Sequence, residues 1–224
     1  MKFLSIALPK GRLFDPAVEM FRQLGLVNIE LKENSRQLIL TDEKSKMKFI
    51  IVRAQDIPTY VEHGAADFGI VGKDVLLEKA SDVYQPLDLK FGQCRLSIAG
   101  PRKMARADFW DELLHRHVRV ATKFPSVAKQ YFTSKGVQAE FIKLYGSIEL
   151  APLTGLADLI VDIVDTGKTL KANGLVEIET IMEASSWLIV NKVSLSTEFD
   201  RVDSIIKGLQ KIVNGDQVGG ITND

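Results

Sequence analysis

Short apolar runs rich in β-branched residues alternate along this chain with segments in which apolar residues recur at helical spacing. Such alternation is typical of α/β domains, in which helices cover parallel sheets. The apolar runs predict strands at residues 3–8, 37–40, 47–52, 68–71, 95–99, 118–121, 140–144, 159–163 and 187–190. The helical patterns begin near residues 13, 57, 73, 108, 126, 148, 168 and 199. The sequence therefore predicts an α/β fold.

A weak internal repeat indicates duplication. Residues 57–71 and 148–162 each consist of isoleucine, six further residues, the motif Gly-x-Ala-Asp and an apolar run. We interpret each copy as a helix that ends at glycine, a tight turn, and a buried strand entered through Asp67 or Asp158. Because glycine caps so many helices, the same order of elements also arises by chance in α/β proteins, and that alternative stays open.

Two similar lobes follow from such a duplication. We place the first α/β lobe at residues 1–92 plus 185–224 and the second at residues 93–184. Ligands of two-lobed α/β proteins bind where the carboxyl ends of strands converge, so we expect a ligand cleft between the lobes.

The charge of the chain is balanced, with 29 Lys plus Arg against 29 Asp plus Glu. We therefore expect neither nucleic acid nor a membrane as a partner, and any anion site must be built locally. Residues 9–12, Pro-Lys-Gly-Arg, interrupt the first apolar run before a signal-peptide core forms, and no apolar run approaches the roughly 20 residues that span a bilayer. We expect a cytoplasmic protein in which the lone Cys94 is a small buried hydrophobic residue.

The strongest local signal is a polar turn after the apolar run at residues 159–164. The turn has the sequence Asp-Thr-Gly-Lys-Thr and opens a predicted helix. Gly167 lets the backbone approach a ligand closely, and amide groups at a helix N-terminus favour an anion. Thr166 and Thr169 add hydroxyl groups. This pattern predicts a site for a phosphate monoester.

Two carboxylates accompany the turn. Asp162 and Asp165 suit sugar hydroxyls or a bound cation, because a carboxylate repels phosphate. The ending Gly-Lys-Thr is not part of a Walker A motif, which requires glycine five residues before Gly167, where this chain has Asp162.

Several blocks of the sequence resemble the ATP phosphoribosyltransferase family in its short form. The main block contains Glu149, Gly155, Ala157, Ile160, Asp162, Ile163, Thr166, Gly167, Thr169 and Leu170. Further matching positions are Ala7 to Leu13, Arg53, Asp56 to Pro58, Tyr60, Val61, Gly64, Asp67, Gly69, Ile70, Gly72, Asp74, Arg119 to Thr122, Pro125, Gly146, Ser147, Ala151 and Pro152. The resemblance spans residues 1–191.

The resemblance implies the first step of histidine biosynthesis, in which ATP and phosphoribosyl pyrophosphate give phosphoribosyl-ATP and pyrophosphate with Mg2+. It also implies a fold like that of the type II periplasmic binding proteins. Two alternatives stay open at this point. One is a type I purine or pyrimidine phosphoribosyltransferase, which uses a free base, and the other is a non-catalytic two-lobed solute-binding protein.

Within this reaction each candidate residue receives a role. The ribose phosphate is assigned to Thr166, Gly167, Lys168 and Thr169, and the ribose hydroxyls to Asp162 and Asp165. The candidate catalytic residues are Arg53, Lys10 and Arg36, with Arg12 as a further phosphate ligand, because each lies in a loop after or between predicted strands. Arg53 is the best of these candidates, since it directly follows a buried run and its forked guanidinium can bridge two phosphate oxygens.

Structural alternatives remain for four of these side chains. Arg12 and Arg36 are equally well explained as ordinary surface charges. Asp74 either binds the nucleotide or caps the next helix, and Glu149 either binds substrate or orients the start of its helix. We expect no metal site of the protein's own, because Mg2+ arrives with the substrate phosphates, and no zinc at the His-x-His pair of residues 115–117.

The resemblance also implies partners. The family's long branch carries an additional C-terminal domain that binds histidine, whereas the short branch works with a separate subunit resembling histidyl-tRNA synthetase. After Asn191 this sequence predicts only one amphipathic helix, at residues 199–213, and a polar, disordered tail at residues 216–224. We therefore expect a homodimer within a hetero-oligomer that contains the synthetase-like regulatory subunit.

Overall fold

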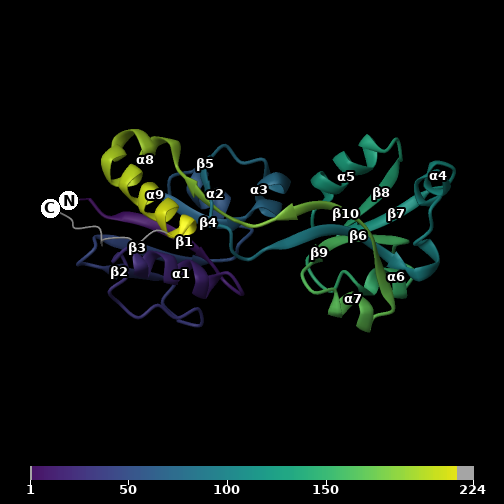
Figure 1. Ribbon diagram of the computed structural model, residues 1–224, viewed down its shortest axis with the longest axis horizontal. Coiled ribbons are helices and arrows are strands. Elements are labelled where there is room, and N and C mark those ends of the chain that lie inside the picture. Colours follow the sequence, from purple (N-terminus) through teal and green to yellow (C-terminus); the bar gives the residue numbers. More distant parts are fainter. Residues whose placement is uncertain (1, 216–224) are drawn as a thin grey trace. The chain divides into compact units, whose positions relative to one another are not determined.

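The computed structural model describes residues 2–215 of the chain, which form two compact α/β units (Figure 1). The first unit runs to Gly92 and resumes at Ser185, and the second consists of Gln93–Ala184. The tail at residues 216–224 lies outside the described residues, so its disorder stays a prediction. None of the helices between residues 2 and 215 is both long and apolar enough to cross a membrane.

The first unit contains a six-stranded sheet in the order β2-β3-β1-β4-β11-β5. Its strands are β1 (Leu4–Pro9), β2 (Ile39–Asp42), β3 (Met47–Val52), β4 (Phe68–Gly72), β5 (Tyr84–Asp88) and β11 (Ser186–Val190). Its helices are α1 (Phe14–Gln23), α2 (Ile57–Glu62), α3 (Lys73–Lys79), α8 (Lys192–Thr197) and α9 (Phe199–Asn214). Strands β3, β1 and β4 run parallel, and the other pairings are antiparallel.

Strand β1 is buried on both faces, which explains its nearly continuous apolar sequence. Ile6 and Leu8 lie in one core together with side chains of α1 and α9, while Ala7 lies in the second core with side chains of α2 and α3. The predicted amphipathic helix near the C-terminus is confirmed as α9, whose Val202 and Leu209 are buried in the first of these cores.

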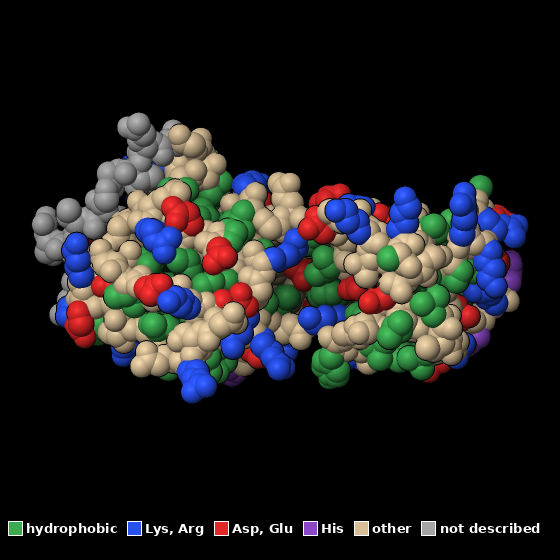
Figure 2. Space-filling view, turned by 90° about the horizontal axis from the view of Figure 1, so that it is seen from below, with side chains coloured by type: hydrophobic (Ala, Val, Ile, Leu, Met, Phe, Trp, Pro, Cys, Tyr) green, Lys and Arg blue, Asp and Glu red, His purple; other side chains and the backbone are tan. Residues whose placement is uncertain are grey.

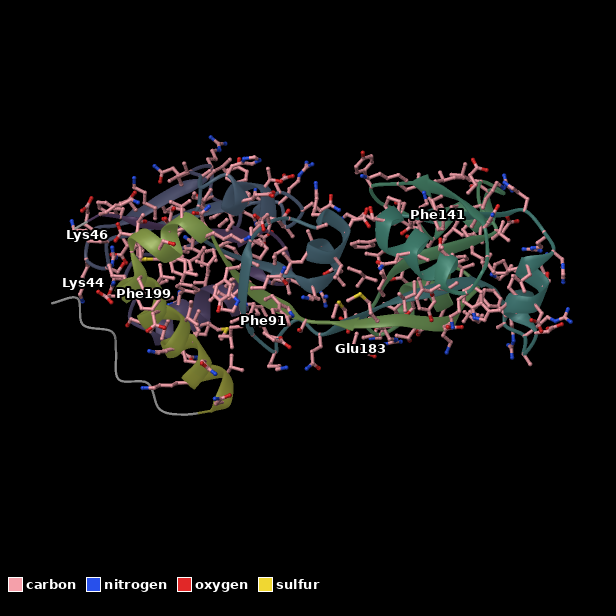
Figure 3. The ribbon with its side chains drawn as sticks, turned by 90° about the horizontal axis from the view of Figure 1, so that it is seen from above. Lys44, Lys46, Phe91, Phe141, Glu183 and Phe199 are labelled. Carbon is pink, nitrogen blue, oxygen red and sulfur yellow. The ribbon has the colours of Figure 1, made fainter. Side chains whose placement is uncertain are left out.

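The second unit contains a five-stranded sheet in the order β10-β6-β9-β7-β8. Its strands are β6 (Cys94–Pro101), β7 (Val118–Thr122), β8 (Ala139–Lys143), β9 (Leu159–Val164) and β10 (Leu175–Ala184). Its helices are α4 (Phe109–Leu114), α5 (Pro125–Ser134), α6 (Leu150–Leu153), α7 (Lys168–Ala172) and the short 3-10 helix η1 (Arg102–Met104). Phe141 on β8, labelled in Figure 3, meets Phe132 of α5 edge to face at a centroid distance of 5.7 Å.

The two sheets share one topology. In the first unit the series β3-β1-β4-β11-β5 has three parallel strands followed by two strands that are each antiparallel to their neighbour, and the series β8-β7-β9-β6-β10 repeats this order. Strand β2 is an additional edge strand of the first unit. The internal repeat places its two copies at corresponding strands, β4 and β9.

The two aspartates of the repeat each accept a hydrogen bond from a backbone N–H group of the neighbouring parallel strand. The Asp67 carboxylate accepts a 2.7 Å hydrogen bond from the backbone N–H of Ser5 in β1, and the Asp158 carboxylate accepts one of 2.9 Å from the N–H of Arg119 in β7. In each copy the preceding glycine has a left-handed backbone, with φ of 71° at Gly64 and 73° at Gly155. The repeat is therefore a structural device that starts the central strand in register with its parallel neighbour.

The pattern missed two strands and two short helices and placed one strand two residues early. Strands β5 and β10, helix α8 and the 3-10 helix η1 were not predicted, and strand β2 begins at Ile39 rather than at residue 37. Strand β10 has irregular register against β6 near residues 177–182, which breaks the alternation of inward and outward side chains on which a strand prediction depends. Cys94 is buried, as expected.

Candidate active site

The predicted phosphate turn lies at the carboxyl end of β9. Val164 is buried, whereas Asp165, Thr166, Lys168 and Thr169 are exposed. Gly167 is the N-cap residue of α7 and has φ 72° and ψ 4°, a left-handed conformation that favours glycine. The first hydrogen bond of α7 runs from the N–H of Lys171 to the carbonyl of Gly167 at 3.1 Å.

This geometry leaves the turn able to bind a ligand. Within residues 2–215, the backbone N–H groups of Thr166 to Thr169 donate to no protein acceptor. Free N–H groups at the start of a helix favour an anion, and the exposed residues Thr166 and Thr169 carry hydroxyl groups in the same turn. We call residues 165–169 the phosphate loop.

Asp162 lies on β9, upstream of the phosphate loop. Burial raises the pKa of its carboxyl group, the nearby charge of Glu149 raises it further, and the charge of Lys123 lowers it. The N–H of Ile163 also lowers this pKa by donating a 2.8 Å hydrogen bond to Asp162. The charges of Glu149 and Lys123 therefore act on the Asp162 carboxyl group in opposite directions.

Glu149 lies at the N-cap position of α6 and makes no capping hydrogen bond with its side chain. The expected role of Glu149 in orienting the helix start therefore has no side-chain contact to support it. The preceding Ser147 has a left-handed backbone with φ 50°, and its carbonyl accepts the N–H of Leu150 at 3.1 Å. The charge of Glu149 instead acts on Asp162, whose pKa it raises.

Lys123 was not singled out from the sequence. It directly follows β7, which runs parallel to β9, so the two strands end at the same edge of the sheet. The buried hydroxyl of Thr122 donates a 2.6 Å hydrogen bond to the carbonyl of Val161 and accepts one of 2.9 Å from the N–H of Phe124. These bonds fix the backbone on both sides of Lys123. A charged residue just after a buried strand was the available signal.

In the first unit, three of the predicted cationic residues lie at one sheet edge. Strands β1 and β3 end side by side, and the N–H of Lys10 donates to the carbonyl of Val52 at 2.9 Å, so Lys10 and Arg53 follow adjacent strand ends. Arg36 precedes β2, which runs antiparallel to β3 and therefore starts at the same edge. The side chains of Lys10, Arg36 and Arg53 are all exposed.

Arg12 differs from these three residues. Its guanidinium donates to the carbonyl of Gly92 at 3.3 Å, and the N–H of the preceding Gly11 donates to the carboxylate of Glu33 at 2.8 Å. Arg12 is thus attached to the end of the first segment of its unit.

Asp74 is buried, with 6% of its surface exposed, and lies in the first turn of α3. Its carboxylate folds back over Gly72, where an added Cβ would lie 2.1 Å from the Asp74 Oδ1 atom. Gly72 is the N-cap residue of this helix and has no side chain to cap it. The adjacent Lys73 lies over the ring of Trp187 and donates to the Gln85 side chain at 2.9 Å.

No metal cluster accompanies these residues. Among residues 2–215, no group of three or more His, Cys, Asp and Glu side chains is placed to hold a metal ion. The exposed His117 ring lies 3.9 Å from the carboxylate of Glu140. Positive and negative side chains are interspersed on the molecular face drawn in Figure 2, in keeping with the balanced composition.

Comparison with solved structures identifies the fold. The substrate binding protein of an amino acid ABC transporter matches with a TM-score of 0.61 at 12% identity, over 96% of this chain and 94% of that chain. The expected two-lobed fold of the type II periplasmic-binding-protein kind is confirmed.

Comparison with known sequences identifies the family. The HisG model, described as ATP phosphoribosyltransferase, matches residues 53–211. An ATP phosphoribosyltransferase of Geobacter metallireducens is 54% identical over 211 residues, which are 94% of this chain and 99% of that relative. A chain of the ATP phosphoribosyl transferase (HisG:HisZ) complex from Thermotoga maritima matches with a TM-score of 0.81 at 36% identity, covering 96% of this chain and 100% of that one. The chain therefore belongs to the ATP phosphoribosyltransferase family.

Proposed function

We propose that this chain transfers the phosphoribosyl group of phosphoribosyl pyrophosphate to ATP, releases pyrophosphate, and thereby catalyses the first step of histidine biosynthesis. Family membership supports the reaction. The observation that carries the site is the phosphate loop, in which the N–H groups of Thr166 to Thr169 have no protein acceptor within the described residues. The carboxyl group of Asp162 lies on the strand that leads into this loop.

In this reaction a ring nitrogen of adenine forms a bond to the anomeric carbon of the ribose while the bond from that carbon to pyrophosphate breaks. Positive charge develops on the ribose ring, and negative charge grows on the departing pyrophosphate. The protein has little proton transfer to perform. Its tasks are to position two polyanions and to stabilise the charges of the transition state.

The phosphate loop takes the 5′-phosphate in this proposal. Thr166, Gly167, Lys168 and Thr169 supply N–H groups at the start of α7, two hydroxyls and one ammonium group. Asp162 accepts hydrogen bonds from the ribose hydroxyls, and Asp165, the first residue of the loop, is a second candidate for this task. Glu149 belongs to the same site through its interaction with Asp162.

The cationic residues of the first unit take the phosphates of ATP and the departing pyrophosphate. Arg53, Lys10 and Arg36 are exposed at one sheet edge, where their charges are available to a polyanion. Arg12 and Asp74 are further candidates at this edge. Arg12 already contacts the Gly92 carbonyl, and Asp74 is buried against Gly72, so both also stabilise local structure.

Mg2+ fits this arrangement as a companion of the substrates. Mg2+ usually binds proteins through one or two carboxylates together with substrate phosphates, and no larger ligand cluster occurs among residues 2–215. When bound, Mg2+ would neutralise phosphate charge, and the carboxylates of Asp162, Asp165 and Glu149 are the candidates to contact it.

We further infer a cytoplasmic homodimer that works with a regulatory subunit resembling histidyl-tRNA synthetase. The Thermotoga maritima relative, whose whole chain is matched, was solved as a HisG:HisZ complex. Co-purification with the synthetase-like protein from the same organism, followed by sizing and by assays with added histidine, tests this assembly. A lone chain with full activity and strong histidine inhibition would contradict it.

Pyrophosphate release from phosphoribosyl pyrophosphate tests the reaction. We expect release with ATP and none with free purine or pyrimidine bases. Release with a free base would indicate a type I phosphoribosyltransferase. Absence of pyrophosphate release both with ATP and with free bases, together with tight binding of another small molecule, would indicate a solute-binding protein.

A further inference from the structure

An ion pair on the sheet of the second unit contacts the backbone of the phosphate loop. Arg95 of β6 donates from Nε and Nη2 to the two carboxylate oxygens of Glu177 on β10, each at 2.6 Å. Its remaining nitrogen, Nη1, donates to the backbone carbonyl of Asp165 at 3.0 Å. Arg95 pairs with Val164 across the sheet, so its side chain starts beside the last residue of β9.

The Glu177 carboxylate has further hydrogen-bond donors besides Arg95. Its Oε1 atom also accepts hydrogen bonds from the hydroxyls of Ser97 at 2.7 Å and Thr180 at 3.2 Å. The bond from Arg95 is the main cause that lowers the Glu177 pKa to about 2, so this carboxylate stays ionised at neutral pH. The planar guanidinium is fixed along one side by two parallel bonds, which sets the direction of its third donor.

Fixing the Asp165 carbonyl also fixes the N–H of Thr166. In a trans peptide group the C=O and the following N–H lie in one plane and point in opposite directions. Because the Asp165 C=O points to Arg95, the Thr166 N–H points away from Arg95. Thr166 is the first of the loop residues whose N–H has no acceptor among the described residues.

We propose that Arg95 and Glu177 are positioning residues for phosphoribosyl pyrophosphate: they hold the Asp165–Thr166 peptide group so that its N–H faces the 5′-phosphate. The inference rests on the proposed function of the phosphate loop. Neither residue touches the substrate in this arrangement, and their effect is transmitted through one backbone carbonyl.

Two substitutions test the inference in the full-length protein. Glu177→Gln keeps the size of the side chain but replaces one acceptor by an NH2 group, which cannot accept the second Arg95 bond. Arg95→Lys keeps the charge but cannot donate to Glu177 in two parallel bonds and to Asp165 at the same time. For each variant we expect the KM for phosphoribosyl pyrophosphate to rise about tenfold, the loss expected for one misplaced hydrogen bond. The KM for ATP should stay within about twofold, well below that loss.

Glu179→Gln is the matched control. Glu179 lies on the same strand and accepts hydrogen bonds from Trp110, Tyr131 and Lys135, but it makes no contact with the phosphate loop. Thermal unfolding should show that Glu177→Gln and Glu179→Gln both lower stability, whereas only Glu177→Gln weakens substrate binding. Equal KM values for phosphoribosyl pyrophosphate in the two variants would show that Arg95 and Glu177 have only a structural role.

Calorimetry with two substrate fragments identifies which contact is lost. Ribose 5-phosphate carries the 5′-phosphate alone, so its binding should weaken in both Arg95→Lys and Glu177→Gln, while binding of inorganic pyrophosphate should not change. Thr169→Ala separates this inference from the proposed function. If Thr169→Ala weakens ribose 5-phosphate and the Arg95 and Glu177 variants do not, the positioning role is wrong. If Thr169→Ala also has no effect, the phosphate loop itself is wrongly assigned, and the positioning role is refuted with it.

Discussion

Two glycines flank helix α7 with nearly the same backbone, and they separate the stability of the phosphate loop from its function. Gly167 precedes the helix with φ 72°, and Gly174 follows it with φ 68°. An added Cβ would meet no atom within 4 Å at Gly174, and at Gly167 its nearest neighbour would be the Val164 Cγ1 atom at 3.8 Å. Alanine at either position is therefore strained by backbone conformation and not by crowding.

The expected loss of stability follows from this geometry. A left-handed conformation costs a non-glycine residue about 1 to 2 kcal/mol. Removing glycine also restricts the unfolded chain, which returns about 0.4 to 1 kcal/mol. Gly167→Ala and Gly174→Ala should therefore each destabilise the second unit by about 1 kcal/mol.

Binding should distinguish the two variants. At Gly167 the new methyl group stands among the N–H groups proposed to hold phosphate, so we expect binding of phosphoribosyl pyrophosphate to weaken at least about tenfold, or about 1.4 kcal/mol. Gly174 lies at the far end of α7, and its replacement should leave binding unchanged. Calorimetry measures the binding.

Urea unfolding measures the stability of each unit separately. The chain has two tryptophans, Trp110 in the second unit and Trp187 in the first, so a Trp187→Phe background makes fluorescence report on the second unit alone. Equal losses of substrate affinity in Gly167→Ala and Gly174→Ala would show that general destabilisation, not loop geometry, causes the effect. Unchanged affinity in Gly167→Ala would refute the phosphate-loop assignment.

Three further predictions concern the duplicated anchors, the carboxylate pair and the cationic edge. Asp67→Ala removes the acceptor of three hydrogen bonds, from the Ser5 N–H, the Ser5 hydroxyl and the Ser194 hydroxyl, and should destabilise the first unit by about 4 kcal/mol in urea unfolding. Asp158→Ala removes one backbone hydrogen bond and a partly exposed 3.7 Å ion pair with Arg119, and should destabilise the second unit by only about 1 kcal/mol. Equal losses would refute this reasoning. Glu149→Gln removes a charge that raises the pKa of Asp162, so Asp162 stays ionised to lower pH. The acid limb of the pH profile of kcat/KM for phosphoribosyl pyrophosphate should therefore move to lower pH. An unchanged acid limb would exclude Asp162 as the titrating group. Arg53→Ala should lower kcat by raising the activation free energy by about 2 to 4 kcal/mol, and Arg53→Lys should restore kcat in part. A change in KM alone would show that Arg53 binds the substrates and not the transition state.

The sequence predicted the strand ends of the site better than their contacts. The apolar run of β9 and the polar turn after it are local features that the sequence shows directly. The left-handed conformation of Gly167 is a further finding of the structure. The interaction of Lys123 with Asp162 instead depends on the pairing of β7 with β9, which a single sequence does not show. The bonds from Arg95 to Glu177 join residues 82 positions apart. Glu177 lies on β10, a bulged strand that the pattern did not predict.

The two units are alike where their central strands begin and differ where those strands end. Asp67 and Asp158 anchor the starts of β4 and β9 in the same way, and this position serves folding in both units. The residues after the two strands differ: β4 leads directly into α3 with the buried Asp74, whereas β9 leads into an exposed turn of Thr, Gly and Lys. An anchor at one end of a strand leaves the other end free to change without loss of register. The phosphate loop therefore occupies the same position in its sheet as the start of α3 does in the first unit, but its residues differ. The Asp158 anchor holds only the start of β9, whereas the Arg95–Glu177 pair holds the backbone at the end of β9 through the Asp165 carbonyl.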